Sequence, residues 1–269
     1  MNKLPKAMTF DCYGTLIDWE GEIQRFFAQR LAARQRTDVD VWALQRHWET
    51  VQFQFQFQFQ SPEAFQDPEA GREKRDHLPP SEGKYTHETL NSQEKMQQMF
   101  YRPYREILRH TMKVAFEDFK LPYSEEDVEL FASSMGRWQP FPDTRAALRI
   151  LQKYMKLALI TNTDDAIIAQ TEQLLGITFD AIVTAEQAKA YKPAHTGFHL
   201  ARQRLGLEVK DIWHAGFGFK YDIIPAHELG YTTIWINRQG EARPADVKET
   251  FLVGDMATLV HLVKGIAAG

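Results

Sequence analysis

Four segments of this chain place polar or charged side chains directly after short apolar runs. Continuous apolar runs of this length are typical of buried parallel strands, and the carboxyl ends of such strands meet at one edge of a sheet. A carboxylate, a hydroxyl, an amide, an ammonium and a second carboxylate are therefore predicted to surround one crevice. In chain order these groups are Asp11, Thr161, Asn162, Lys192 and Asp222.

The order and spacing of these segments resemble the haloacid dehalogenase superfamily over residues 7–20 and 140–255. Within that superfamily, the run Phe-Asp-Cys-Tyr-Gly-Thr-Leu-Ile-Asp-Trp at 10–19 looks like the (S)-2-haloacid dehalogenase branch. The run Trp-Ile-Asn-Arg at 235–238 is similar to that branch as well. Four motifs in the correct order make the resemblance far more specific than any single motif.

The resemblance implies a hydrolase that dehalogenates a small 2-haloalkanoic acid in two steps. Asp11 attacks C2, expels halide and forms an aspartyl ester, and water then cleaves the ester at the Asp11 carbonyl to give the inverted 2-hydroxy acid. Lys192 keeps Asp11 ionised and stabilises charge on the ester carbonyl. Asp222 holds Lys192 and helps to position or activate the water, and Thr15 orients Asp11.

The same resemblance implies a set of substrate-binding groups. Thr161 and the backbone N–H groups of Cys12 and Tyr13 would bind the substrate carboxylate. Asn162 would contact the departing halide. Trp19, together with aromatic residues of the helical region, would line an apolar pocket that keeps bulk water out.

Some positions depart from the dehalogenase pattern. Phe217 and Phe219 stand where that pattern has small polar residues, one of which helps to seat the hydrolytic water. The arginine that binds the halide has no unique match in the sequence. Arg46 is our candidate, and its alternatives are Arg30, Arg34 and Arg36.

Two aromatic residues argue against metal-dependent phosphoryl transfer. Phosphatases of the superfamily place a second Asp two residues after the nucleophile, where this chain has Tyr13. They also use an acidic residue five positions before the final Asp, where this chain has Phe217. Because Mg²⁺ requires several hard oxygen ligands in an octahedral array, we expect no metal and no other cofactor.

The elements that must position these groups fall into two kinds. Beyond residue 142 helix and strand patterns alternate, which predicts an α/β fold with a doubly wound, Rossmann-like parallel sheet. Residues 20–137 are mostly helical in pattern, with a polar stretch over 61–94 that we expect to form a long loop. We therefore predict a helical cap inserted after the first strand, where it can act as a lid. The predicted domains are a core of residues 1–19 and 138–269 and a cap of residues 20–137.

Residues 52–60 alternate Gln and Phe. A period of two is typical of a strand, and such a run also resembles a segment prone to β-aggregation. The helical neighbourhood nevertheless favours a helix. We expect its phenylalanines to pack inside the helical region, with a substrate pocket or a subunit contact as alternatives.

Composition limits the possible partners. With 43% hydrophobic residues, 25% charged residues and a net charge of −4, the chain is typical of a soluble globular protein and offers no basic surface for nucleic acid. Its one cysteine, Cys12, excludes an internal disulfide and a cysteine metal cluster. No run approaches the ~20 apolar residues of a membrane span. We expect a cytoplasmic enzyme for a small 2-substituted carboxylic acid, and the resemblance implies a homodimer.

Two alternative functions remain open. The same covalent mechanism could act on a non-halide leaving group, such as the C–N bond of azetidine-2-carboxylate, and the aromatic residues at 217 and 219 motivate this hypothesis. The chain could also be a degenerate, non-catalytic protein that binds a partner through the Gln/Phe run. A phosphatase is the least favoured interpretation.

Overall fold

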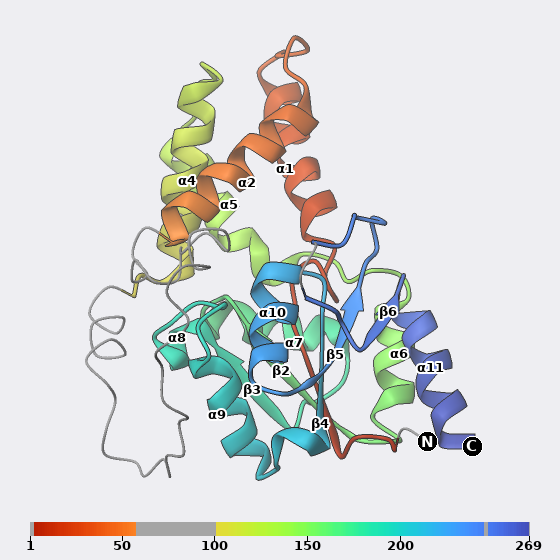
Figure 1. Cartoon of the computed structure of the whole chain (residues 1–269). Helices are drawn as coiled ribbons and strands as arrows, with labels where there is room; N and C mark the ends of the chain where they lie inside the picture. The colour runs from red at the N-terminus through yellow and green to blue at the C-terminus, as the bar shows by residue number, and fades with distance from the viewer. Residues whose placement is uncertain (1–2, 58–100, 245–246, 269) are drawn as a thin grey trace.

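A computed structural model describes residues 3–57, 101–244 and 247–268 of the chain. In this described part, one sheet of six parallel strands has the order β3-β2-β1-β4-β5-β6 (Figure 1). This arrangement confirms the predicted α/β fold with a doubly wound parallel sheet. The strands are β1 (Ala7–Phe10), β2 (Lys156–Thr161), β3 (Ala181–Thr184), β4 (Ile212–Gly216), β5 (Thr232–Ile236) and β6 (Phe251–Val253).

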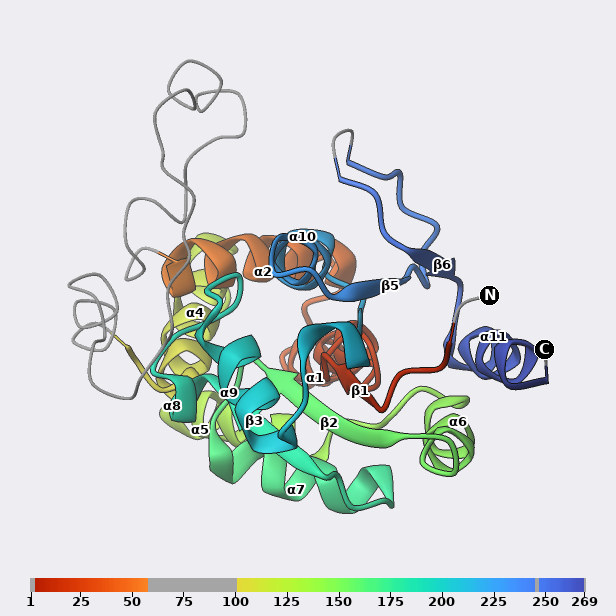
Figure 2. The same cartoon turned by 60° about the horizontal axis from the view of Figure 1, so that its bottom comes forward.

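Helices cover both faces of the sheet, as the alternation of side chains along each strand requires. Met8 and Phe10 of β1 face a core that includes Leu148 and Ile168, whereas Ala7 faces a second core with Phe198. Figure 2 shows α6 beside α11 on the first of these faces. The first face carries α6 (Thr144–Leu151), α7 (Asp165–Leu175) and α11 (Met256–Ala268), and the second carries α9 (Thr196–Leu205) and α10 (Ile224–Glu228).

A group of helices, the helical insertion, lies between β1 and β2 in the chain and above the carboxyl edge of the sheet (Figure 1). Its core is aromatic: the rings of Phe27 and Phe131 stack with centroids 5.4 Å apart, and Trp48 packs against both. The helices are α1 (Trp19–Ala33), α2 (Val41–Phe57), α4 (Tyr104–Asp118) and α5 (Glu125–Ser134). The division into a core and a cap domain stays a prediction, and the predicted loop over 61–94 lies outside the described residues.

The Gln/Phe run is helical through residue 57, where α2 ends, and residues 58–60 lie outside the described part. In this run the helix buries two glutamines rather than the phenylalanines: Gln52 and Gln56 are 1% and 3% exposed. Gln54 faces solvent. Phe53 and Phe55 are half-buried on the flanks, Phe53 stacking on Tyr221 and Phe55 on the ring of His110. The described helices include none with both the length and the apolar character that a membrane crossing requires.

A tight turn follows β1 and carries the first predicted catalytic group. The amides of Leu16 and Ile17 both donate to the carbonyl oxygen of Cys12, at 2.7 and 3.0 Å. Gly14 adopts a φ of +92°, and a Cβ added there would lie 2.4 Å from the ring of Phe217. Glycine is therefore required at this position for two reasons: the backbone has a positive φ, and the ring of Phe217 leaves no room for a Cβ atom.

We predict that Gly14→Ala is more destabilising than a matched glycine substitution. Gly206 also has a positive φ, of +65°, but a Cβ there would meet nothing within 4 Å. Gly206→Ala should therefore lower the free energy of unfolding by about 1 kcal/mol, from backbone strain alone. Gly14→Ala should lower it by about 3 kcal/mol, because overpacking against Phe217 adds to the strain. Urea unfolding measures both values, and equal losses would contradict the predicted contact.

Candidate active site

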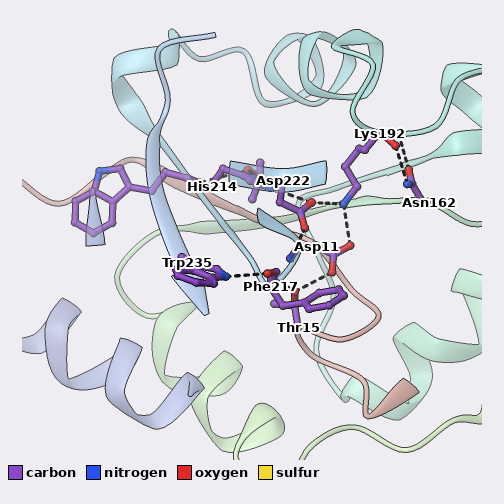
Figure 3. Close-up of polar contacts among 11 residues, drawn as sticks. Asp11, Thr15, Asn162, Lys192, His214, Phe217, Asp222 and Trp235 are labelled. Carbon is purple, nitrogen blue, oxygen red and sulfur yellow. Dashed lines mark hydrogen bonds and ion pairs between the residues drawn. The ribbon is translucent and has the colours of Figure 1, made fainter. Parts of the chain in front are cut away.

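The carboxyl edge of the sheet holds a lysine between two carboxylates (Figure 3). The Lys192 Nζ atom lies 2.8 Å from Asp11 Oδ1 and 2.5 Å from Asp222 Oδ1. All three side chains are buried. Asp11 directly follows β1, Lys192 follows β3 and the short helix α8 (Ala185–Ala188), and Asp222 lies in a π-helical turn after β4. The topology thus brings together three predicted groups that are far apart in the sequence.

A second chain of hydrogen bonds fixes the other oxygen of Asp11. The hydroxyl of Thr15 donates to Asp11 Oδ2 at 2.8 Å and accepts the backbone N–H of Phe217 at 2.9 Å. The carbonyl of Phe217 in turn accepts the indole N–H of Trp235 at 2.9 Å (Figure 3). Because each Asp11 oxygen accepts a hydrogen bond, from Lys192 and from Thr15, the carboxylate group has one fixed orientation.

Burial and charge act against each other in this cluster. Burial raises the pKa of Asp11 to about 6, although the Lys192 ammonium lowers it, and Asp222 adds a further rise. For Asp222, burial also raises the pKa, but Lys192 and His214 together outweigh it and the pKa lies below its ordinary value. The two carboxylates likewise overcome burial at Lys192 and raise its pKa. At neutral pH the cluster therefore holds two carboxylates and one ammonium.

His214 of β4 lies behind Asp222 and was not among the predicted site residues (Figure 3). Its ring is fully buried, its Nδ1 atom lies 2.9 Å from the hydroxyl oxygen of Thr9, and its Nε2 atom lies 3.6 Å from Asp222 Oδ1. Burial lowers the pKa of His214 below its ordinary value, so the ring is neutral at pH 7. Its position within a β-strand gave no signal that its ring would face the Asp222 carboxylate.

A cavity of about 60 Å³ separates the sheet edge from the helical insertion. Its floor comes from the strand ends and its roof from the helices. The floor comprises Asp11, Tyr13, Thr161, Asn162, Lys192, Phe217, Tyr221 and Asp222. The roof comprises Trp19, Gln52, Phe53, Gln56, Tyr104 and Met135. The sequence reasoning did not single out Tyr104, Met135 and Tyr221, nor the two glutamines individually.

The two polar residues at the end of β2 differ in what they offer this cavity. Among the described residues, the buried Thr161 hydroxyl has no hydrogen-bond partner, so it is available to a molecule in the cavity. Asn162 instead bonds the backbone of Lys192 in both directions: its Oδ1 accepts from the lysine N–H at 2.7 Å, and its Nδ2 donates to the lysine carbonyl at 3.2 Å. Asn162 therefore positions the lysine.

Two of the predicted binding residues, Arg46 and Phe219, lie outside the cavity lining, whereas Cys12 and Tyr13 are predicted to bind through their backbone N–H groups rather than their side chains. Arg46 is exposed and lies outside the cavity lining, about 9 Å along α2 from the cavity-facing Gln52. Phe219 packs edge-on against Trp235, 4.9 Å between centroids, and does not line the cavity. The thiol of Cys12 is buried in the core, and burial raises its pKa. Tyr13 lines the cavity, but its hydroxyl lies 2.7 Å from that of Thr171.

The alternative arginines are also engaged elsewhere. Arg30 and Arg34 both pair with Asp127, at the start of α5. Arg36 pairs with Asp38 in the loop before α2. Within the residues that the structure describes, no arginine lines the cavity.

The donor set of this site does not fit a magnesium ion. Asp11 and Asp222 are both paired with the Lys192 ammonium, so the charge of these two carboxylates is already partly balanced by a cation of the protein. Phe217 offers only an apolar ring to the cavity, and the Tyr13 hydroxyl is turned to Thr171. Over the described ranges, no three His, Cys, Asp or Glu side chains gather as a metal site would require. We therefore derive no step through a metal.

Comparison with known proteins agrees with this geometry. A family model described as haloacid dehalogenase-like hydrolase matches residues 5–230. The chain is 28% identical to haloacetate dehalogenase H-2 of Moraxella sp. (strain B) over 168 residues, which cover 61% of this chain and 74% of that protein. It is 29% identical to an (S)-2-haloacid dehalogenase of Pseudomonas putida over 124 residues, 45% of this chain and 54% of that enzyme. A crystal structure of an L-2-haloacid dehalogenase has the same fold, with a TM-score of 0.76 and 19% identity over 98% of this chain and 100% of that one.

We predict that Lys192→Met destabilises the protein in a pH-dependent way. Without the ammonium, two buried carboxylates face each other, so the free energy of unfolding at pH 8 should fall by about 3–5 kcal/mol. The loss of the cation also raises both carboxyl pKa values in the folded state. A raised carboxyl pKa favours the folded state as pH falls, so the variant should regain part of its stability at pH 5. Urea unfolding of variant and wild type at both pH values measures this difference, and a deficit that does not change with pH would contradict it.

Proposed function

The chain belongs to the haloacid dehalogenase-like hydrolase family, and on this basis we propose that it hydrolyses small 2-haloalkanoic acids through a covalent aspartyl ester. The observation that carries the proposal is the buried Asp11–Lys192–Asp222 cluster at the floor of a small cavity. The names of the relatives, haloacetate and (S)-2-haloacid dehalogenase, support the substrate class. Family membership as a hydrolase also speaks against the non-catalytic alternative. A cytoplasmic homodimer stays part of the proposal.

In the first step an oxygen of Asp11 attacks C2 of the acid from the side opposite the halogen. The new C–O bond forms as the carbon–halogen bond breaks, and the electron pair of that bond leaves with the halide. Thr15 and Lys192 hold the two carboxylate oxygens and so fix the line of attack. The unpartnered Thr161 hydroxyl is placed to bind the substrate carboxylate.

In the second step water attacks the carbonyl carbon of the Asp11 ester. Asp222 accepts a proton from that water, and Lys192 stabilises the negative charge on the ester oxygen. Collapse of the tetrahedral intermediate breaks the bond between the Asp11 carbonyl carbon and the ester oxygen, and that oxygen takes the remaining proton of the attacking water. The 2-hydroxy acid then leaves with inverted configuration at C2, Asp11 is restored, and the proton on Asp222 returns to solvent.

A second candidate keeps the same nucleophile but opens a C–N bond, as in azetidine-2-carboxylate. The cavity lining favours it in one respect: the only cation that the described residues bring to the cavity, Lys192, already pairs with both carboxylates. A halide would therefore leave without a dedicated cation, whereas an amine needs none. Conversion of azetidine-2-carboxylate to 4-amino-2-hydroxybutanoate, measured beside release of chloride from a 2-chloro acid, distinguishes the two leaving groups.

We predict that the protein releases chloride from (S)-2-chloropropionate and forms (R)-lactate. Asp11→Asn should lower kcat/KM about 10⁴-fold or more, because the nucleophile is lost while the volume of the side chain is kept. Asp38→Asn is the matched control, since this exposed aspartate lies outside the cavity lining and should leave the rate unchanged. Ion chromatography of chloride and chiral analysis of lactate provide the readout. Full activity in Asp11→Asn, or retention of configuration, would contradict the mechanism.

The pKa of Asp11 makes a second prediction. Attack requires the ionised carboxylate, so kcat/KM should fall about tenfold per pH unit as pH drops well below the Asp11 pKa of about 6. The charged groups that face Asp11 do not titrate there, because the pKa of Asp222 is lowered and that of Lys192 is raised. Glu49 is the control, since burial raises its pKa to about 7. Glu49→Gln should leave the midpoint in place, and a midpoint that moved with it would assign the titration to Glu49.

A further inference from the structure

The roof of the cavity contains a pair of buried amides whose hydrogen bonds are incomplete. Gln52 and Gln56 are one turn apart on α2, and both line the cavity. Gln52 Nε2 donates to Gln56 Oε1. In the part of the chain that the structure describes, Gln52 Oε1 and Gln56 Nε2 have no partner. The pair therefore presents one carbonyl oxygen and one NH₂ group without a partner.

This outcome does not depend on how each amide is turned. A primary amide carries one carbonyl and one NH₂ group, and two amides joined by one hydrogen bond use one of each. Exchanging oxygen and nitrogen in both side chains reverses the bond but again leaves one acceptor and one donor. The pair thus offers both hydrogen-bonding functions in either orientation.

Burial of this pair is unfavourable unless something in the cavity completes it. A buried polar group without a partner lowers stability by about 1–3 kcal/mol. The helix nevertheless buries these two glutamines and turns Gln54 to solvent, while Phe53 and Phe55 remain half-buried. Over residues 52–56 the buried face therefore carries amides where an ordinary amphipathic helix carries apolar side chains.

The position of the pair relative to the floor indicates which part of a ligand it meets. Thr161, at the floor, has the unpartnered hydroxyl that suits the substrate carboxylate. The amides lie on the opposite wall, flanked by Phe53, and Trp19 completes the roof. A halide accepts hydrogen bonds but donates none, so it would leave the free carbonyl unpaired. A group that both donates and accepts matches the pair completely.

We propose that Gln52 and Gln56 bind a neutral substituent of the substrate that donates one hydrogen bond and accepts another. The cavity of about 60 Å³ favours a small group, and a hydroxyl is the smallest that performs both functions. This inference rests on the proposed function and specifies its substrates: 2-haloacids that carry a hydroxyl on the adjacent carbon, such as 2-chloro-3-hydroxypropionate.

The test compares two acids of nearly equal shape. 2-Chloro-3-hydroxypropionate and 2-chlorobutanoate differ by a hydroxyl in place of a methyl group. Chloride release is measured for each, with an enzyme-free blank, in wild type, Gln52→Leu/Gln56→Leu and Gln54→Leu. Gln54→Leu is the matched control, because it makes the same change in the same run on the solvent-facing side.

Wild type and Gln54→Leu should prefer the hydroxy acid by about tenfold or more in kcat/KM, because an analogue without the hydroxyl leaves two buried amide groups unpaired. The double variant should lose this preference, so that its kcat/KM values for the two acids become about equal. Equal rates of wild type on the two acids, or a preference that survives in the double variant, would overturn the inference while leaving dehalogenation intact. No chloride from either acid would overturn the proposed function and this inference with it. Because equal rates of wild type on the two acids would by themselves overturn the inference, the test does not depend on folding of the double variant.

Discussion

The ammonium of Lys192 between Asp11 and Asp222 is the interaction on which the rest of this site depends. Two carboxylates buried this closely would otherwise repel each other, and burial would drive both to bind protons. The lysine pairs with both and so allows the proposed nucleophile and the proposed base to remain ionised together. The neighbouring contacts serve that arrangement, since Asn162 fixes the lysine backbone and Thr15 fixes the free oxygen of Asp11.

The sheet and the helical insertion have different parts in this account. The sheet supplies every charged group that lines the cavity, held at strand ends that are rigid because their strands are buried on both faces. The insertion supplies aromatic and amide side chains, none of them charged, which exclude water and contact the part of a ligand that does not react. With this division, residue changes in the roof can alter which substrate binds, while the groups that carry out the reaction stay the same. Because the Lys192 ammonium opposes the effect of burial, the pKa of Asp11 rises only to about 6 and this carboxylate is still ionised at neutral pH.

The sequence predicted the parts of the site that are fixed by local patterns. Apolar runs located the strands, and parallel strand ends must converge, so the amino-acid order alone was enough to place Asp11, Lys192 and Asp222 together. The roof could not be predicted in the same way, because which face of a helix points inward depends on its packing. Arg46 accordingly lies outside the cavity lining, and the period of the Gln/Phe run concealed that Gln52 and Gln56 are its buried residues. Phe219 turned away because the π-helical turn after β4 changes the direction of successive side chains.

The most direct test of the covalent mechanism is a single turnover in H₂¹⁸O with the protein in excess over (S)-2-chloropropionate. Mass spectrometry of the peptide that contains Asp11 then reports where the solvent oxygen enters. If water cleaves the ester at the Asp11 carbonyl, one ¹⁸O atom is found in that peptide and the lactate of the first turnover carries none. Label that appears in the lactate, with an unlabelled Asp11 peptide, would mean that water attacks C2 directly and would contradict the role assigned to Asp11.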